Sequence, residues 1–279
     1  MKTPSLDRVR AERRLGSTAL ARMALDCFRE LAASEMVDDG DVKMLGLELE
    51  KARPSMALLK RFSREVVKRY QELASTGLER RDALLQACEY VESEYEGRMR
   101  ELVDKASRYL SQYERVLTHS HSGTVVNVLS RALGVRKVLV LESRPMCEGR
   151  ITATTLSKTK QVELWVDAAS GYAVQNCQAC VVGADVIFPD GSFSGKVGSI
   201  PLALLCREYG RPFYVVADLW KIDEKTGYII EEGGAGEVWD EGGEVVVRNP
   251  YFEIVRAELV HGYLTEEGFL KPWELATAI

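Results

Sequence analysis

The sequence predicts an α/β protein in which an N-terminal helical subdomain precedes a Rossmann-like, doubly wound parallel sheet. Two observations support this fold class. Apolar residues recur at three- and four-residue spacing from about Asp7 to Ser111, and short β-branched runs alternate with helical stretches from Tyr113 onward. The 279 residues, 46% of them hydrophobic, are enough for a full core. We therefore expect a helical subdomain over residues 1–112 and a Rossmann-like domain over residues 113–279.

The helical subdomain contains three long amphipathic patterns. They are GSTALARMALDCFREL, MALLKRFSREVVKRYQEL and RDALLQACEYVESEYEGRMRELVDKASRYL. Pro54 and the cluster of Ser75, Thr76 and Gly77 mark breaks between helices, because proline and glycine interrupt helical hydrogen bonding.

The second domain is expected to contain five main strands with helices between them. The strands are predicted at VLTH, KVLVLES, QVELWVD, ACVVGADVIF and PFYVVAD. Their nearly continuous Val, Leu and Ile content is typical of strands buried on both faces. The segment KIDEKTGYIIEEGGAGEVWDEGGEVVVRNP is acidic and rich in glycine, which predicts an exposed hairpin or loop excursion before the closing segment.

Composition excludes several classes of protein. The net charge of -5 argues against binding to nucleic acid or to a membrane surface through bulk charge. No apolar run reaches the roughly 18 residues of a membrane span, and the first residues lack the apolar core of a signal peptide. These features predict a cytoplasmic protein that binds neither membranes nor nucleic acid directly.

The six cysteines are scattered and are expected to be reduced. Cys177 and Cys180 form a CxxC pair, but a zinc site needs about four ligands and no second pair follows. A structural role for both thiols is therefore favoured over metal or redox work. We expect no metal and no cofactor.

Polar residues follow every predicted strand of the second domain. Ligands bind beyond the carboxyl ends of the strands of an open parallel sheet, where the amino ends of helices also gather. Five polar strand ends at one edge predict a binding crevice there, although each one alone is more typical of a solvated loop. These strand ends are at His119–Ser122, Glu142–Arg144, Asp167, Gly183–Asp185 and Asp218–Lys221.

The stretch GADVIFPDGSFSGKVGSIPLALL carries the most information about this crevice. Its glycines permit tight turns, and Ser199 as N-cap with Pro201 in the first turn predicts a helix whose amino end faces an anion. Lys196 lies at that position. The stretch is no Walker A loop, because the glycine spacing is one residue short and Val197 replaces the magnesium ligand. No GxGxxG follows the first strand, so the phosphate of a small molecule is favoured over a dinucleotide.

Several of these segments together resemble one superfamily. LTHSHS, ESRPMCEGR, VVGADVIFPDGSFSGKVGS, PFYVVADLWK and NPYFEIVRAELVHGYLTEEG occur in the order of its signature segments, and RRLGSTALAR and ARPSMALL resemble its amino-terminal ones. The superfamily includes the alpha, beta and delta regulatory subunits of translation initiation factor 2B. It also includes methylthioribose 1-phosphate isomerase and archaeal ribose 1,5-bisphosphate isomerase. The resemblance covers essentially the whole chain.

The resemblance implies a set of ligand-binding residues. The isomerases hold the sugar phosphate with an amino-terminal glycine segment, two arginines and a lysine, and paired guanidinium donors and an ammonium suit phosphate oxygens. For Arg53 taken alone, a surface salt bridge is the simpler expectation. The matching positions here are Arg14, Gly16, Ser17, Arg53, His121, Arg144, Gly195 and Lys196.

Catalysis is less well supported than binding. The isomerases pair a cysteine with an aspartate; the aspartate matches Asp185, but the cysteine position holds Ser120. A hydroxyl is harder to ionise than a thiol and would need a neighbouring base, for which His119 and His121 are candidates. The asparagine usually found before the lysine is Gly195, which removes a side-chain amide.

Two functions stay open at this point. The first is a regulatory subunit similar to those of initiation factor 2B. It would bind a sugar phosphate or nucleotide phosphate at the position that corresponds to the active site of the isomerases. The second is an aldose-ketose isomerase acting on a phosphorylated pentose through Asp185, with Ser120 or a histidine in place of the cysteine. Either is expected to form a homo-oligomer, a dimer or hexamer, or to pair with related subunits, and the first implies contact with the translation initiation machinery.

Overall fold

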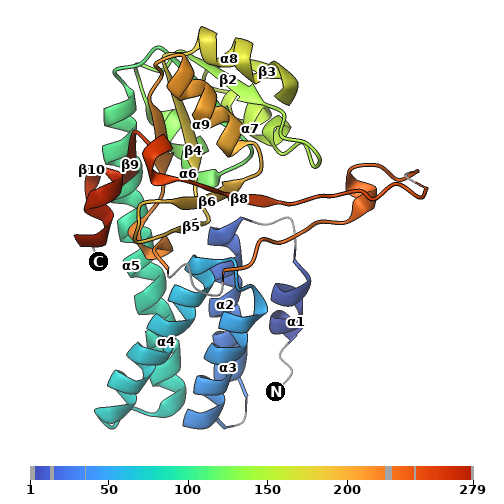
Figure 1. Ribbon diagram of the computed structural model, residues 1–279. Coiled ribbons are helices and arrows are strands. Elements are labelled where there is room, and N and C mark those ends of the chain that lie inside the picture. Colours follow the sequence, from blue (N-terminus) through green and yellow to red (C-terminus); the bar gives the residue numbers. More distant parts are fainter. Residues whose placement is uncertain (1–3, 13–15, 35, 224–227, 242, 278–279) are drawn as a thin grey trace. The chain divides into compact units, whose positions relative to one another are not determined.

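The computed structural model describes residues 4–12, 16–34, 36–223, 228–241 and 243–277, and the chain forms two compact units (Figure 1). The first is Met1–Arg98 and the second is Met99–Ile279. The division lies inside one long helix, α5 (Arg80–Leu110), so that the last turns of α5 belong to the second unit. The predicted fold class, helices followed by a mainly parallel sheet, is confirmed. In the described part of the chain, no helix combines the length and apolar character needed to cross a membrane.

The first unit is a bundle of helices built on amphipathic faces. Its helices are α1 (Pro4–Ala11), α2 (Ser17–Ala32), α3 (Asp39–Ala52), α4 (Ala57–Ser75) and the first part of α5. The core between them is aromatic and aliphatic, and the rings of Phe62 and Tyr95 meet edge to face at 5.0 Å. Gly46 of α3 faces Val67 of α4 so closely that a Cβ would lie 2.7 Å from its side chain. A small residue is therefore needed where these two helices pack.

The second unit contains a seven-stranded sheet in the order β10-β9-β7-β4-β1-β2-β3. All neighbouring strands are parallel except β9 and β10. The strands are β1 (Arg115–His119), β2 (Lys137–Leu141), β3 (Gln161–Trp165), β4 (Ala179–Gly183), β7 (Phe213–Val216), β9 (Gly262–Thr265) and β10 (Gly268–Leu270). Since β1 pairs with β2 on one side and with β4 on the other, the strand order reverses at β1 and β4. This is the switch point at which doubly wound sheets bind their ligands.

Helices cover both faces of this sheet, which explains its continuous apolar strands. One core layer joins the strands to α8 (Ser170–Asn176) and α9 (Ser199–Glu208). The other joins them to α6 (Gly123–Arg131), α7 (Gly149–Leu156) and the last turns of α5. Cys177 and Cys180 lie in the first layer, where burial raises the pKa of both thiols. This placement fits the structural role expected for the pair.

A small antiparallel sheet departs from the sequence prediction. The segment ACVVGADVIF, expected as one strand, divides into β4 and β5 (Val186–Ile187). β5 pairs with β6 (Phe193–Lys196), and β6 pairs with β8 (Phe252–Val255), in a second three-stranded sheet. The break at Gly183–Asp185 lets the chain leave the large sheet, because the amide of Asp185 donates to Ser194 of β6 at 2.9 Å.

The acidic, glycine-rich segment before β8 forms an extended excursion (Figure 1). We call Ile229–Pro250 the arm. Its base is closed by backbone hydrogen bonds, from Gly233 to Asn249 at 2.8 Å and from Tyr251 to Glu231 at 2.9 Å. Trp239 and Val246 of the arm are exposed. The predicted hairpin or loop excursion is confirmed.

Candidate functional site

The carboxyl ends of β1 and β4 form the centre of the candidate site in the second unit. The loop after β1 leads into α6, whose N-cap is Ser122 and whose first residue is Gly123. Gly183 at the end of β4 approaches so closely that a Cβ there would lie 2.8 Å from the Ser122 hydroxyl. This close approach brings the amino end of α6 to the switch point, where the Ser122 hydroxyl accepts from the amide of Val125 at 3.4 Å.

His119 links two of the loops around this point by hydrogen bonds. Its Nε2 lies 2.8 Å from the carbonyl oxygen of Val197, and its Nδ1 lies 3.0 Å from the hydroxyl of Ser143. A carbonyl only accepts, so Nε2 carries the proton, and because burial lowers the pKa of this histidine the ring is neutral and Nδ1 accepts from Ser143. Both nitrogens are therefore used to hold the loops together. The expectation that His119 could act as a base is not supported by this geometry.

Ser120 has a backbone conformation that non-glycine residues rarely adopt. Its φ is +63°, in the left-handed region. The amide donates to Ser143 Oγ at 2.7 Å, and the carbonyl accepts from Thr152 Oγ1 at 2.8 Å. A strained residue fixed from both sides in this way is characteristic of functional sites. In the described part of the chain, no group is hydrogen-bonded to the Ser120 hydroxyl.

His121 is held in one tautomer by the same threonine. The single hydroxyl hydrogen of Thr152 goes to the Ser120 carbonyl, so the ring Nδ1, 3.0 Å from Thr152 Oγ1, must be the donor. Burial lowers the pKa of His121, which leaves the other ring nitrogen, Nε2, as a neutral acceptor. His121 is therefore the histidine of this loop with a nitrogen available to a ligand.

The loop after β2 is anchored by Asp167, which follows β3. One carboxylate oxygen accepts from the amide of Ser143 at 2.8 Å and the other from the amide of Arg144 at 2.7 Å. The exposed guanidinium of Arg144 donates to the carbonyl of Val238 in the arm at 3.1 Å. The structure therefore places the Arg144 backbone at the crevice but directs its side chain to the arm.

Lys196 is enclosed by two protein groups. Its Nζ lies 2.6 Å from Oε1 of Glu148, and 4.9 Å from the centre of the Tyr251 ring. Only 13% of the lysine side chain is exposed. The ammonium that was predicted to meet a phosphate is thus already paired with a carboxylate.

The amino end of α9 differs from the sequence prediction. The N-cap is Gly198, with a φ of +103°, and Ser199 is the first helical residue, whose hydroxyl donates to the Lys196 carbonyl at 2.7 Å. The helix does not present its amides to an open anion site, because Glu253 Oε1 accepts from Gly198 at 2.8 Å and from Ile200 at 2.6 Å. The prediction of Ser199 as N-cap was wrong because Gly198 takes a conformation that suits glycine.

Asp185 follows β4 and begins the turn into β5. Next to it, the carbonyl of Ala184 accepts from the buried Nζ of Lys221 at 2.8 Å. Burial also raises the pKa of Tyr228 to about 12, with a further contribution from the charge of Asp185. A buried lysine is therefore bonded to the residue before the predicted catalytic aspartate, and the charge of that aspartate acts on Tyr228.

The first unit holds the remaining predicted residues. Gly16 is the N-cap of α2, and the buried Ser17 is its first residue. Arg53 is 3% exposed and donates to the carbonyl of Glu12, four residues before Gly16. The Arg53 side chain is therefore buried next to the Glu12 carbonyl and does not lie at the surface. Arg14 lies outside the described residues.

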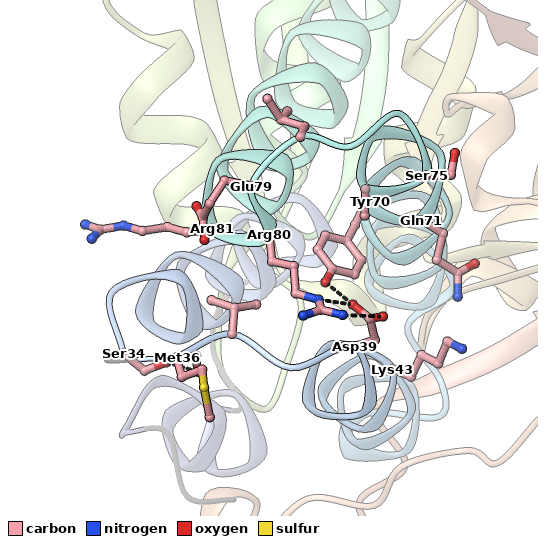
Figure 2. Close-up of a pocket in the computed structure, with 13 residues that line it drawn as sticks. Ser34, Met36, Asp39, Lys43, Tyr70, Gln71, Ser75, Glu79, Arg80 and Arg81 are labelled. Atoms are coloured by element: carbon pink, nitrogen blue, oxygen red, sulfur yellow. Dashed lines mark hydrogen bonds and ion pairs between the residues drawn. The ribbon is translucent and has the colours of Figure 1, made fainter.

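A cavity of about 860 Å³ opens in the first unit, away from these predicted residues. Figure 2 shows Tyr70 and Arg80 converging on Asp39 there. The Tyr70 hydroxyl donates to Asp39 Oδ1 at 2.5 Å and Arg80 Nε donates to the same oxygen at 2.9 Å. Burial and the bond to Asp39 raise the pKa of Tyr70 to about 12. This network ties the starts of α3 and α5 to α4.

Three residues of the site were not predicted from the sequence: Thr152, Glu148 and Glu253. Glu148 lies in ESRPMCEGR and Thr152 just after it, in a stretch for which no helix was predicted. Glu253 is 55 residues from Gly198, and nothing local in NPYFEIV indicates its partner.

Comparisons with known proteins agree with this architecture. The model of a family described as "Initiation factor 2 subunit family" matches residues 13–272. A ribose 1,5-bisphosphate isomerase of Archaeoglobus fulgidus is 28% identical over 95% of this chain and 88% of its own. A putative translation initiation factor eIF-2B subunit 2-like protein of Pyrococcus horikoshii is 30% identical over 96% of this chain and 95% of its own. A crystal structure of the Pyrococcus horikoshii OT3 factor eIF-2B superposes with a TM-score of 0.82 at 28% identity, covering 96% of each chain.

Proposed function

The chain belongs to the initiation factor 2 subunit family, and from this premise we propose that it is a regulatory binding protein of the initiation factor 2B type. Its ligand is a phosphorylated sugar or nucleotide held at the β1–β4 switch point. Its protein partners are further copies of itself or related subunits, and through them the translation initiation machinery. The similarity to the eIF-2B subunit 2-like protein over nearly the whole of both chains supports this choice.

The environment of Ser120 is the observation that carries the proposal. Isomerisation of an aldose phosphate needs one group that removes a proton and one that delivers it. A serine performs such a step only with a base bonded to its hydroxyl. His119 has both nitrogens bonded to Val197 and Ser143, and His121 directs Nδ1 to Thr152. Ligand binding without turnover is the function that this arrangement supports best.

Phosphate binding is supported by helix ends and not by excess charge. The amino end of α6 follows the central strand β1 at the switch point. Backbone amides at such positions bind phosphate oxygens, and the helix dipole favours a negative charge there.

The test combines ligand-induced stabilisation with product analysis. Purified protein is screened by thermal shift against ribose 5-phosphate, ribose 1,5-bisphosphate, methylthioribose 1-phosphate and nucleoside monophosphates. A ligand that binds the folded state raises the melting temperature in proportion to the logarithm of its concentration above Kd. We expect stabilisation by at least one compound and no conversion of it. If no compound raises the melting temperature, the proposal is contradicted.

An isomerase acting on a phosphorylated pentose is the second candidate function. It is supported by the presence of Asp185 and by the similarity to the ribose 1,5-bisphosphate isomerase over 95% of this chain. Turnover by the unmodified protein that disappears in Asp185→Asn would establish it in place of the first. Under our proposal the unmodified protein is inactive, and Ser120→Cys is the variant expected to gain measurable isomerisation.

A further inference from the structure

Glu148 and Lys196 form a short ion pair in which one carboxylate oxygen is left over. Oε1 lies 2.6 Å from Lys196 Nζ. Oε2 is buried, and no residue in the described part of the chain is hydrogen-bonded to it. A buried carboxylate oxygen without a donor is costly, and it marks a place where a further hydrogen-bond donor can bind.

The position of the Glu148 side chain is not explained by its own helix. Glu148 is the N-cap of α7, where a carboxylate ordinarily accepts from the amides of the first turn. No such side-chain bond is formed here. The carboxylate turns to Lys196, 48 residues away, so its role lies in the crevice and not in capping α7.

Two features near the switch point could bind an anion, the ammonium of Lys196 and the amino end of α9. Carboxylates of the protein already occupy both. Glu148 neutralises the ammonium of Lys196, and Glu253 accepts from the amides of Gly198 and Ile200 at the amino end of α9. A phosphate placed at Lys196 would therefore approach like charges. A neutral oxygen has no such penalty, because a hydroxyl accepts from an ammonium and donates to a carboxylate at the same time.

We propose that Glu148 and Lys196 together bind a hydroxyl group of the sugar, while the phosphate is held elsewhere. Because Oε2 is buried, the two side chains separate to admit the ligand hydroxyl between them. Glu148 then gains the donor that it lacks. This inference rests on the proposed function, and it makes Glu148 the residue that selects the sugar over inorganic phosphate.

The experiment compares two probes, D-ribose 5-phosphate and inorganic phosphate, by isothermal titration calorimetry. The variants are Glu148→Gln, which keeps the shape of the side chain, and Lys196→Met. Losing a hydrogen bond to a charged group weakens binding roughly tenfold or more. We expect that loss for ribose 5-phosphate in both variants, while the Kd for inorganic phosphate changes by no more than about twofold in Glu148→Gln.

Glu163→Gln is the matched control. It removes the carboxylate of another ion pair of the same unit, Lys137–Glu163 at 2.5 Å, on the edge strand β3. Both probes should bind this variant as they bind the unmodified protein. Thermal unfolding of each variant shows whether it is folded. If Lys196→Met does not fold, the isosteric variant Glu148→Gln still tests the inference.

Three results would overturn the inference. If Lys196→Met weakens inorganic phosphate as much as ribose 5-phosphate, the lysine is a phosphate ligand. If Glu148→Gln tightens both probes, Glu148 only repels anions. If Glu148→Gln binds both probes normally, the residue has no role in the ligand site. In all three cases the proposed binding function survives. Failure of the unmodified protein to bind either probe would reject the inference, whereas the proposed function is rejected only if the thermal-shift screen also finds no ligand.

Discussion

Individual residues in unusual conformations shape the crevice. Ser120 and Ser143 have φ values of +63° and +66°, and Gly198 has one of +103°. A Cβ added to Gly198 would lie 2.9 Å from two atoms of the His119 ring. The glycine is therefore required both by its backbone and by the imidazole that packs on it.

Gly198→Ala is expected to destabilise the second unit by about 1–3 kcal/mol, because strain in the left-handed region adds to the contact with His119. Urea unfolding monitored by circular dichroism measures the change. Gly171→Ala is the control, since Gly171 lies in α8 and a Cβ there meets nothing within 4 Å. That variant should be neutral or stabilised by up to about 1 kcal/mol.

The buried His119 predicts a loss of stability in mild acid. Burial lowers its pKa below 6.5 in the folded protein, so the unfolded chain binds the proton more readily. Stability should be constant above pH 6.5 and should fall as the pH drops below that value. Urea midpoints at pH 7.5, 6.5 and 5.5 measure this trend. His121 and His261 contribute in the same direction, because burial also lowers the pKa of each.

The variant His119→Gln separates these contributions. It should be less stable at pH 7.5 and should lose less stability between pH 6.5 and 5.5 than the unmodified protein. An unchanged pH dependence would show that His119 is not the titrating group. His261→Asn, which alters an exposed ring, serves as the comparison.

The sequence indicated which residue types lie at the strand ends of the candidate site but not their partners. Segment patterns identified Ser120, His121 and Lys196, since each follows or precedes a recognisable strand or helix. The pairing of Lys196 with Glu148, and of Gly198 with Glu253, joins residues about fifty positions apart. Such contacts depend on the folded chain path, which local periodicity does not encode.

At the scale of elements, the amino end of α9 and Gly198 before it are stabilised by a side chain from β8. Glu253 provides the acceptor that Ser199 was expected to provide. The main strands and helices around the large sheet were predicted because the spacing of their apolar residues in the sequence matches the faces that they bury. The three-stranded sheet was missed, since its two- to four-residue strands are too short to show alternation.

Glu253→Ala is expected to cost about 1–2 kcal/mol of stability, because two amides at the amino end of α9 lose their acceptor. Hydrogen exchange measured by mass spectrometry should show faster exchange at residues 198–202 than in the unmodified protein. Glu258→Ala is the control, since its carboxylate is exposed and paired only with Arg256 at 3.0 Å. Equal protection of α9 in both variants would contradict this account of the cap.

At the scale of the whole molecule, exposed apolar side chains gather near one edge of the large sheet. β3 is the edge strand, and Leu164 on it and Val166 after it are 48% and 56% exposed. Tyr172 of α8 and Ile151 of α7 are also exposed. An edge strand with apolar neighbours is a typical place for association, and we propose that copies of the chain pair there.

Under this proposal Leu164→Asp lowers the mass of the particle in solution, because it places a charge within the proposed contact. Size-exclusion chromatography with light scattering measures the mass directly. Leu133→Asp is the control: Leu133 is 89% exposed but lies between α6 and the amino end of β2. A monomeric unmodified protein, or equal masses for the two variants, would reject pairing at β3.

The hydrogen bond between Arg144 and the carbonyl of Val238 links the loop after β2 to the arm. The next residue along the arm is Trp239, whose indole is half exposed to water. A ligand phosphate that attracts the guanidinium would compete with that carbonyl and alter the surroundings of the indole. Occupancy of the crevice would then be visible as a change in tryptophan emission, recorded on the unlabelled protein while the ligand is added.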